Sequence, residues 1–303
     1  MSFDLYFCWL KKERLDFEAV ATWAVGIENF SRKGSQLWYE NPKTGVYFSF
    51  DFDPQGSETL ENSPVPNEYF DSGLSFGLNF NRPSFFGYEA MPFVERLAKR
   101  FGLCIVDPQV DADEPVLMTE IDSKSLTDSW LKHNKWAILT LIKDPSFSNP
   151  LRMPTAASLY LWRYKKAKED LERACGDEIY VPHLVPVHRK GTTKVGRAVT
   201  CTQGVPIIVP EAEWVIIVRA KKRFFRPKEK HEVSVVSAET FHELLRGHIR
   251  AFQWPDPPVQ VISSESTEKV GRILQSIDSM LARSEFEVIG ADAFIDIELP
   301  ENE

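Results

Sequence analysis

The sequence predicts an α+β protein, in which mainly antiparallel sheets carry helices packed on one face, arranged as two domains or lobes. Apolar residues alternate along segments such as 45–52, as in half-buried strands, whereas segments such as 88–101 place them at helical spacing. The length of 303 residues suggests two domains or one large domain. Hydrophobic residues make up 43% of the chain and charged residues 26%, an ordinary globular composition that excludes wholesale disorder.

A first domain is expected over residues 1–115, with elements in the order β-α-β-β-β-α-β. Its strands are predicted at 3–9, 36–40, 45–52, 74–80 and 103–106, and its helices at 16–30 and 88–101. Pro42 fixes φ and Gly45 permits a positive φ, so the second and third strands are joined by a tight turn. Proline is tolerated only in the first turn of a helix, so the second helix should begin near Pro92.

A second α+β domain is expected over residues 116–258, followed by a C-terminal segment, 259–303, whose helix and strand pack back on it. Helices are predicted at 126–142, 155–174, 241–249 and 267–281, and strands at 179–187, 198–202, 205–209, 214–218, 233–236 and within 286–299. The proline-rich run 254–258 indicates a stiff linker.

The four cysteines point to a reducing compartment. Cys8, Cys104, Cys175 and Cys201 form no Cys-x-x-Cys pair, which excludes a zinc ribbon and a thioredoxin-type dithiol. The N-terminal MSFDLYFCWLKKE places its charges after its apolar run, the reverse of a secretory signal, and no apolar stretch approaches the roughly 20 residues that span a bilayer. We therefore expect a soluble cytoplasmic protein with free, mostly buried thiols and no membrane contact.

Several chemistries lack their sequence signatures. The chain has no phosphate-binding loop, no Gly-x-Gly-x-x-Gly fingerprint and no Gly-x-Ser-x-Gly nucleophile elbow. His242 and His248 are six residues apart, whereas two zinc-binding histidines on one helix face stand four apart. No catalytic residue, cofactor or metal site is predicted, and we lean towards a protein that is not an enzyme.

Charge is strongly segregated within the overall net charge of −8. Residues 1–120 carry a net charge of −9, residues 121–258 carry +8 and residues 259–303 carry −7. Either acidic and basic parts of the chain face each other internally, or the acidic part receives a basic partner. The candidate partner-binding residues lie on or near the polar loop 53–72; they are Asp51, Asp53, Glu58, Glu61 and Glu68.

The segment 219–230 is the most basic stretch, with seven positive side chains around two adjacent phenylalanines. Basic and aromatic residues together can bind a nucleic-acid backbone and stack on its bases. The candidate residues for this function are Arg219, Lys221, Lys222, Arg223 and Arg226. The alternative is a solvated hairpin loop, because both flanking segments are typical of strands, and we favour the hairpin.

A third candidate site combines Arg82, Glu89 and Asp107. If the strands that end near Arg82 and Asp107 were parallel neighbours, an arginine and two carboxylates would meet at one sheet edge and could form a polar pocket of an unrecognised enzyme. The same residues could instead form an ion pair that only fixes the loop, and carboxylates alone do not define a reaction. We favour the structural role.

Three segments carry a resemblance: DLYF at 4–7, RPSFFGYEA at 82–90 and VDPQ at 106–109. With scattered pieces up to residue 250, they resemble a diffuse group of uncharacterised bacterial cytoplasmic proteins with no established activity. The resemblance implies a bacterial cytoplasmic protein, and genes of this style often belong to toxin–immunity or other accessory loci.

These observations favour a non-enzymatic protein-interaction module. Its most specific form is an immunity-type inhibitor that binds a toxic partner, a basic toxin, through an acidic and aromatic surface. The alternatives are a nucleic-acid-associated protein that uses the basic segment, and an enzyme with a polar site near Arg82.

Overall fold

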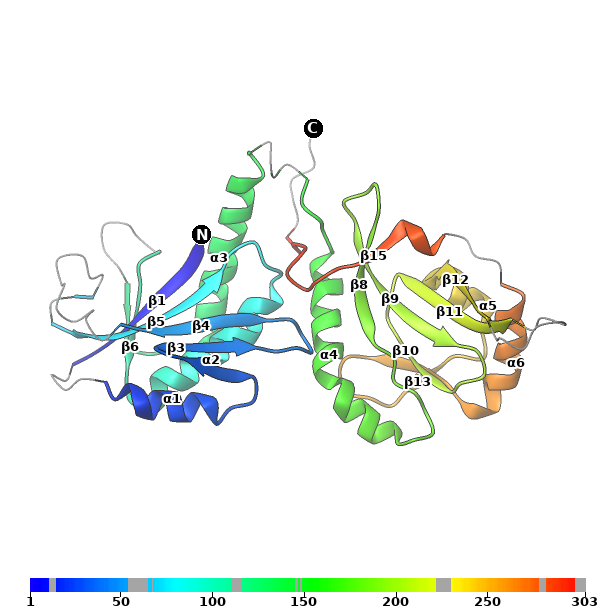
Figure 1. Ribbon diagram of the computed structural model, residues 1–303, viewed down its shortest axis with the longest axis horizontal. Helices are drawn as coiled ribbons and strands as arrows, with labels where there is room; N and C mark the ends of the chain where they lie inside the picture. Colours follow the sequence, from blue (N-terminus) through cyan, green and yellow to red (C-terminus); the bar gives the residue numbers. More distant parts are fainter. Residues whose placement is uncertain are drawn as a thin grey trace. The chain divides into compact units, whose positions relative to one another are not determined.

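The computed structural model describes residues 1–10, 15–53, 65, 66, 68–109, 116–144, 147, 149–221, 230–277 and 282–297. The chain divides into unit 1, Met1–Pro150, and unit 2, Leu151–Glu298 (Figure 1). The described residues form six α-helices and fifteen strands, and most strand pairs are antiparallel, so the chain is an α+β protein as predicted. The division lies at Pro150 rather than near residue 115, because the helix over 123–141 packs within unit 1.

Unit 1 is built on a seven-stranded antiparallel sheet in the order β2-β3-β4-β5-β1-β6-β7. The strands are β1 Ser2–Trp9, β2 Phe30–Lys33, β3 Gln36–Glu40, β4 Tyr47–Phe52, β5 Phe70–Asn79, β6 Cys104–Asp107 and β7 Val116–Met118. Burial alternates along the central strands, so Phe3, Phe50 and Phe76 lie on one buried face. Side chains at the intervening positions lie on the opposite face.

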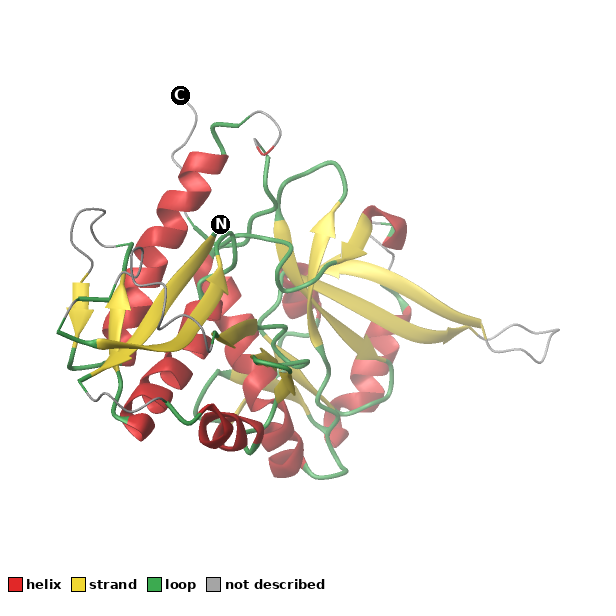
Figure 2. Ribbon diagram, turned by 60° about the vertical axis from the view of Figure 1, so that its left-hand side comes forward, coloured by secondary structure: helices red, strands yellow, loops and turns green. Residues whose placement is uncertain are grey.

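The helices of unit 1 are α1 (Phe17–Val25), α2 (Phe85–Phe101) and α3 (Ser123–Leu141). Each contacts the buried face through an aromatic side chain: Phe17 of α1 stacks on Phe52, Phe93 of α2 contacts Phe48, and His133 of α3 contacts Phe3. The predicted packing of helices on one face is therefore confirmed for unit 1, and Figure 2 shows its helices beside the sheet.

Two helix boundaries in unit 1 differ from the prediction. The first helix was expected to run to Phe30, but α1 ends at Val25, Asn29 takes a positive φ of 72°, and Phe30 opens the unpredicted strand β2. Pro92 lies inside α2 rather than at its start. The helix begins at Phe85 because Phe85 and Phe86 are buried. The free energy gained by burying these two rings outweighs the cost of the backbone hydrogen bond that Pro92 cannot donate.

Unit 2 contains two sheets. The five-stranded sheet has the order β12-β11-β9-β8-β15, and the three-stranded sheet has the order β10-β14-β13. The strands are β8 Leu184–Arg189, β9 Val195–Thr202, β10 Ile207–Pro210, β11 Trp214–Lys221, β12 Lys230–Ser237, β13 Arg250–Phe252, β14 Val259–Ile262 and β15 Phe286–Val288. Strands β13 and β14 flank the proline-rich run, where the sequence predicted only a linker. Strands β9 and β11 pair in parallel.

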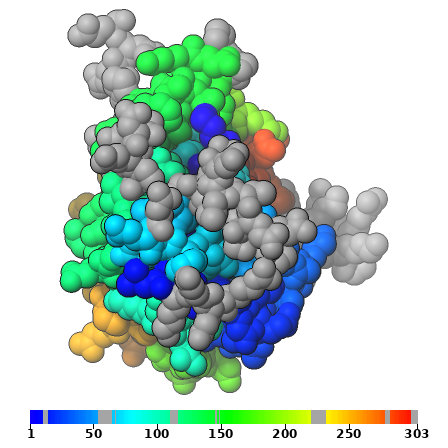
Figure 3. All heavy atoms as spheres, turned by 90° about the vertical axis from the view of Figure 1, so that its left-hand side faces the viewer, coloured from blue at the N-terminus to red at the C-terminus, as the bar shows by residue number. Residues whose placement is uncertain are grey.

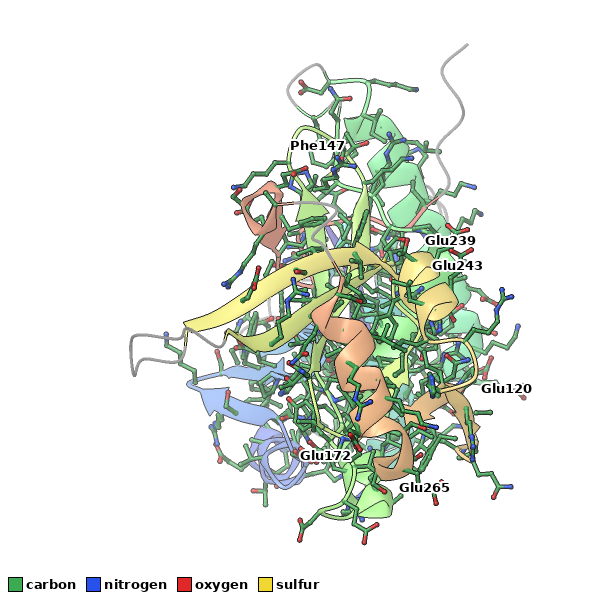
Figure 4. The ribbon with its side chains drawn as sticks, turned by 90° about the vertical axis from the view of Figure 1, so that its right-hand side faces the viewer. Glu120, Phe147, Glu172, Glu239, Glu243 and Glu265 are labelled. Carbon is green, nitrogen blue, oxygen red and sulfur yellow. The ribbon has the colours of Figure 1, made fainter. Side chains whose placement is uncertain are left out.

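Three helices complete unit 2: α4 (Thr155–Cys175), α5 (Ala238–Leu244) and α6 (Ser264–Gln275). Helix α4 packs on β8 and β9, whereas α6 packs on β11. Strand β15 pairs with β8, so the C-terminal helix and strand join the same unit as the preceding residues. Figure 4 shows α5 with Glu239 and Glu243, and α6 with Glu265 near its start.

Candidate functional site

The face of the unit 1 sheet opposite the helices carries polar and aromatic side chains, and we call it the open face. The strand registers set its composition: Asp4 of β1 pairs with Gly77 of β5, Gly77 pairs with Ser49 of β4, and Ser49 pairs with Trp38 of β3. These residues occupy alternate positions to the buried phenylalanines, so they share one side of the sheet. Figure 3 looks onto unit 1, whose N-terminal part is coloured blue and cyan.

A hollow of about 200 Å³ lies on the open face. Its lining residues are Ser2, Asp4, Trp38, Tyr47, Phe48, Ser49, Asp51, Gly77 and Asn79. A Cβ atom at Gly77 would lie 3.5 Å from Oδ1 of Asp4 and 3.7 Å from Oγ of Ser49, so the glycine leaves open the space between those two strands. The two carboxylates give the described lining a formal charge of −2, and the lining has no basic side chain.

Neighbouring hydroxyl and amide groups orient both carboxylates. Ser2 donates a hydrogen bond to Oδ2 of Asp4 at 2.8 Å. Ser49 donates to Oδ2 of Asp51 at 2.7 Å, and Gln36 donates to Oδ1 of the same carboxylate at 2.7 Å. On the same face, burial raises the pKa of the Tyr6 hydroxyl, and the negative charge of Asp4 raises it further.

An aromatic pair forms one wall of the hollow. The rings of Trp38 and Tyr47 stack with centroids 5.6 Å apart and planes 20° from parallel. Arg82 holds Tyr47 in place, because its Nε and Nη2 donate to the Tyr47 hydroxyl at 3.0 and 2.6 Å and its guanidinium lies over the ring. The indole N–H of Trp38 donates to Glu40 at 3.1 Å. This wall therefore combines a flat apolar surface with fixed polar ends.

The predicted partner-binding residues divide into three groups. Asp51 lines the hollow. Asp53 is exposed, and its backbone N–H donates to the carbonyl oxygen of Gly73. Glu68 is also exposed. Glu58 and Glu61 lie outside the described residues. Asp51 and Tyr47, the hydrogen-bond partner of Arg82, line the same hollow, although Asp51 and Arg82 came from different candidate sites.

The predicted polar pocket of Arg82, Glu89 and Asp107 is divided among three separate hydrogen-bond networks. Arg82 bonds Tyr47 and the Asn81 carbonyl oxygen. Glu89 on α2 is buried, and its Oε1 accepts hydrogen bonds from three donors: the Tyr39 hydroxyl at 2.9 Å, Asn41 Nδ2 at 2.7 Å and the Thr44 hydroxyl at 3.0 Å.

Asp107 is fully buried and accepts hydrogen bonds from the Gln109 backbone and the Ser129 hydroxyl. Strand β6, which ends in Asp107, pairs with β1 rather than with β5, and it does so antiparallel. The parallel neighbours that the pocket required are therefore not formed. These contacts give Glu89 and Asp107 structural roles within unit 1.

Arg219, one of the predicted nucleic-acid contacts, is buried, with only 8% of the residue exposed. Its Nη1 donates to the carbonyl oxygens of Leu274, Gln275 and Ile277 at 2.8, 3.2 and 2.6 Å, and its Nη2 donates to the Ser234 hydroxyl at 2.7 Å. Carbonyl groups at a helix C-terminus lack partners within the helix and carry partial negative charge, so a buried arginine satisfies them. Arg219 ties the end of α6 to the sheet.

The remaining predicted nucleic-acid contacts lie beyond what the structure describes. Lys222, Arg223 and Arg226 are outside the described residues, and only the backbone of Lys221 is described, paired with Lys230 where β11 meets β12. The flanking strands β11 and β12 form the antiparallel hairpin that the sequence predicted.

Sequence reasoning missed Asp4, Trp38 and Tyr47 as site residues. Each lies at an alternate position in a strand that was predicted correctly, so the alternation itself placed them on the non-core face. The order of strands, which the sequence does not reveal, brings β1, β3, β4 and β5 together and makes one surface from them.

Comparison with family models, curated proteins and solved structures found no match. Within the described chain, no group of three or more His, Cys, Asp or Glu residues could hold a metal ion. None of the helices formed by the described residues is both long and apolar enough to cross a membrane.

Proposed function

We propose that the protein is a non-enzymatic interaction module that binds a basic protein partner through the open face of unit 1. The observation that carries this proposal is the hollow lined by Asp4 and Asp51 beside the stacked Trp38 and Tyr47. Aromatic residues are enriched in protein interfaces, and complementary charge speeds and orients association. The net charge of −9 over residues 1–120 extends the same attraction over longer distances.

The specific form of this function is an immunity-type inhibitor that neutralises a basic toxin in the bacterial cytoplasm. An acidic surface can occupy the site at which a basic nuclease would bind phosphate. The cysteine content, with no Cys-x-x-Cys pair, is typical of a protein of a reducing compartment.

The two alternatives have less support. A nucleic-acid function would lose Arg219, which is engaged with α6, and would keep Lys221, Lys222, Arg223 and Arg226 of the predicted contacts. An enzyme site at Arg82 would lack Glu89 and Asp107, because each of them is held in its own network.

The test is affinity capture from the host with the tagged full-length chain, followed by toxicity rescue with the captured protein. We expect one stoichiometric basic partner, whose capture weakens as salt rises because exposed charges are screened. The double variant Asp4→Asn/Asp51→Asn should lose this partner and should no longer protect cells that express it.

A matched control removes the same charge from the helical side of unit 1. Glu18 on α1 and Asp128 on α3 have side chains that are 72% and 61% exposed. The double variant Glu18→Gln/Asp128→Asn should keep the partner and the protection. A partner that Asp4→Asn/Asp51→Asn still captures at full strength, or the capture of nucleic acid alone, would refute the proposal.

A further inference from the structure

We propose that the hollow on the open face receives an arginine side chain of the partner, with the guanidinium between the carboxylates and against Trp38. This inference rests on the proposed function and names the group that the surface recognises. The hollow lies wholly within unit 1, and its described lining contains two carboxylates and no basic side chain. Its occupant should therefore carry positive charge.

The positions of the acceptors favour arginine over lysine. Asp4 on β1 pairs with Gly77 of β5, and Asp51 on β4 pairs with Ser75 of β5, so the two carboxylates approach the hollow from opposite sides of β5. A guanidinium has five N–H donors in one plane and can donate in several directions, whereas an ammonium is a compact point charge.

The aromatic wall supplies the remaining contact. A guanidinium stacks on aromatic faces, and Trp is the best such partner. The protein already contains this arrangement next to the hollow, since the guanidinium of Arg82 lies 5.6 Å from the centroid of the Tyr47 ring. Trp38 is stacked on the same tyrosine and borders the hollow.

The floor of the hollow depends on a residue without a side chain. The distances from a Cβ at Gly77 to Asp4 and Ser49 are ordinary van der Waals contacts, so a Cβ fits there. The two γ-methyl groups of Gly77→Val would extend beyond that Cβ and should fill the hollow, while the variant removes none of Asp4, Asp51 and Trp38. This variant separates insertion into the hollow from general attraction to an acidic face.

The experiment is an NMR titration of the full-length protein with N-acetyl-arginine methylamide, observed at the Trp38 indole N–H and assigned with Trp38→Phe. We expect a saturable shift with a dissociation constant near 1 mM, which corresponds to about −4 kcal/mol. The lysine amide should bind at least threefold more weakly, and the uncharged citrulline amide should produce no saturable shift.

Gly77→Val should weaken arginine-amide binding at least tenfold. The control Ala19→Val enlarges an exposed side chain on α1, on the helical side of the sheet, and should bind as the wild type does. Equal binding of the three amides, no saturable shift up to 50 mM, or unchanged binding by Gly77→Val would overturn the inference.

Partner capture separates the two proposals. If Gly77→Val still captures the partner while Asp4→Asn/Asp51→Asn does not, the open face binds the partner without an inserted arginine, and only this inference fails. If both variants capture the partner, the proposed function fails as well, regardless of whether the arginine amide binds in the NMR titration.

Discussion

Replacing Arg219 with methionine tests whether this buried arginine is a structural residue. The variant loses three hydrogen bonds to the carbonyl oxygens that end α6 and one to Ser234. Hydrogen bonds to charged groups contribute about 1.5–3 kcal/mol each, but removing the arginine also removes the penalty of burying its charge. Removing one member of a buried charged network destabilises a protein by about 3–5 kcal/mol, and we expect a loss of that size.

The assay is urea and thermal unfolding followed by circular dichroism, with hydrogen exchange across residues 264–277 as the local readout. For a unit of this size, a loss of about 3–5 kcal/mol lowers Tm by roughly 6–20 °C. Arg272→Met is the matched control, because Arg272 also belongs to α6, is 75% exposed and forms an exposed ion pair with Glu268. It should change stability by about 0.5 kcal/mol or less. If Arg219→Met were as stable as Arg272→Met, the structural role of Arg219 would be refuted.

Three further predictions concern the packing and the titratable groups. Glu89→Ala should destabilise unit 1 by about 3 kcal/mol in urea unfolding, because Tyr39, Asn41 and Thr44 lose their buried acceptor. Glu89→Gln keeps an oxygen at this position and should lose less stability. Equal losses for the two variants would contradict this. Gly87→Ala should cost about 1–3 kcal/mol, because its Cβ would stand 2.5 Å from the Trp130 ring, whereas Gly271→Ala, whose nearest neighbour is 3.5 Å away, should be neutral or stabilising. Burial raises the pKa of the Cys8 and Cys201 thiols to about 12, above the unfolded value of about 8.5. The folded state therefore favours the protonated thiols. The stability that they contribute is fully present below pH ~8.5 and is lost as pH rises towards 12. The urea concentration at the midpoint of unfolding should therefore decrease when the pH is raised from 8 to 10. A thiol reagent at pH 8 should modify the partly exposed Cys104 before it modifies Cys8 or Cys201. An unchanged midpoint or the reverse order of modification would count against this.

Local sequence patterns are sufficient to predict the α+β class and most of the elements. Alternation predicted the strand over 36–40 with the bounds that β3 has, and helical spacing predicted α4 to within one residue. These signals are local, because the period of apolar residues along a strand or helix follows from which side it buries. The errors at β2 and Pro92 arose where burial of phenylalanines overrode local propensity.

Which of the candidate residues lie together depends on the pairing of strands that are distant in the chain. Arg219, Glu89 and Asp107 were conspicuous as charges in the sequence, yet each is buried among hydrogen-bond partners that come from distant segments. Asp4 and Trp38 were inconspicuous, yet the strand order places them on one face with Asp51. The physical reason is that a hydrogen bond or a hollow depends on distances between strands far apart in the chain, and these are set by sheet pairing rather than by local sequence.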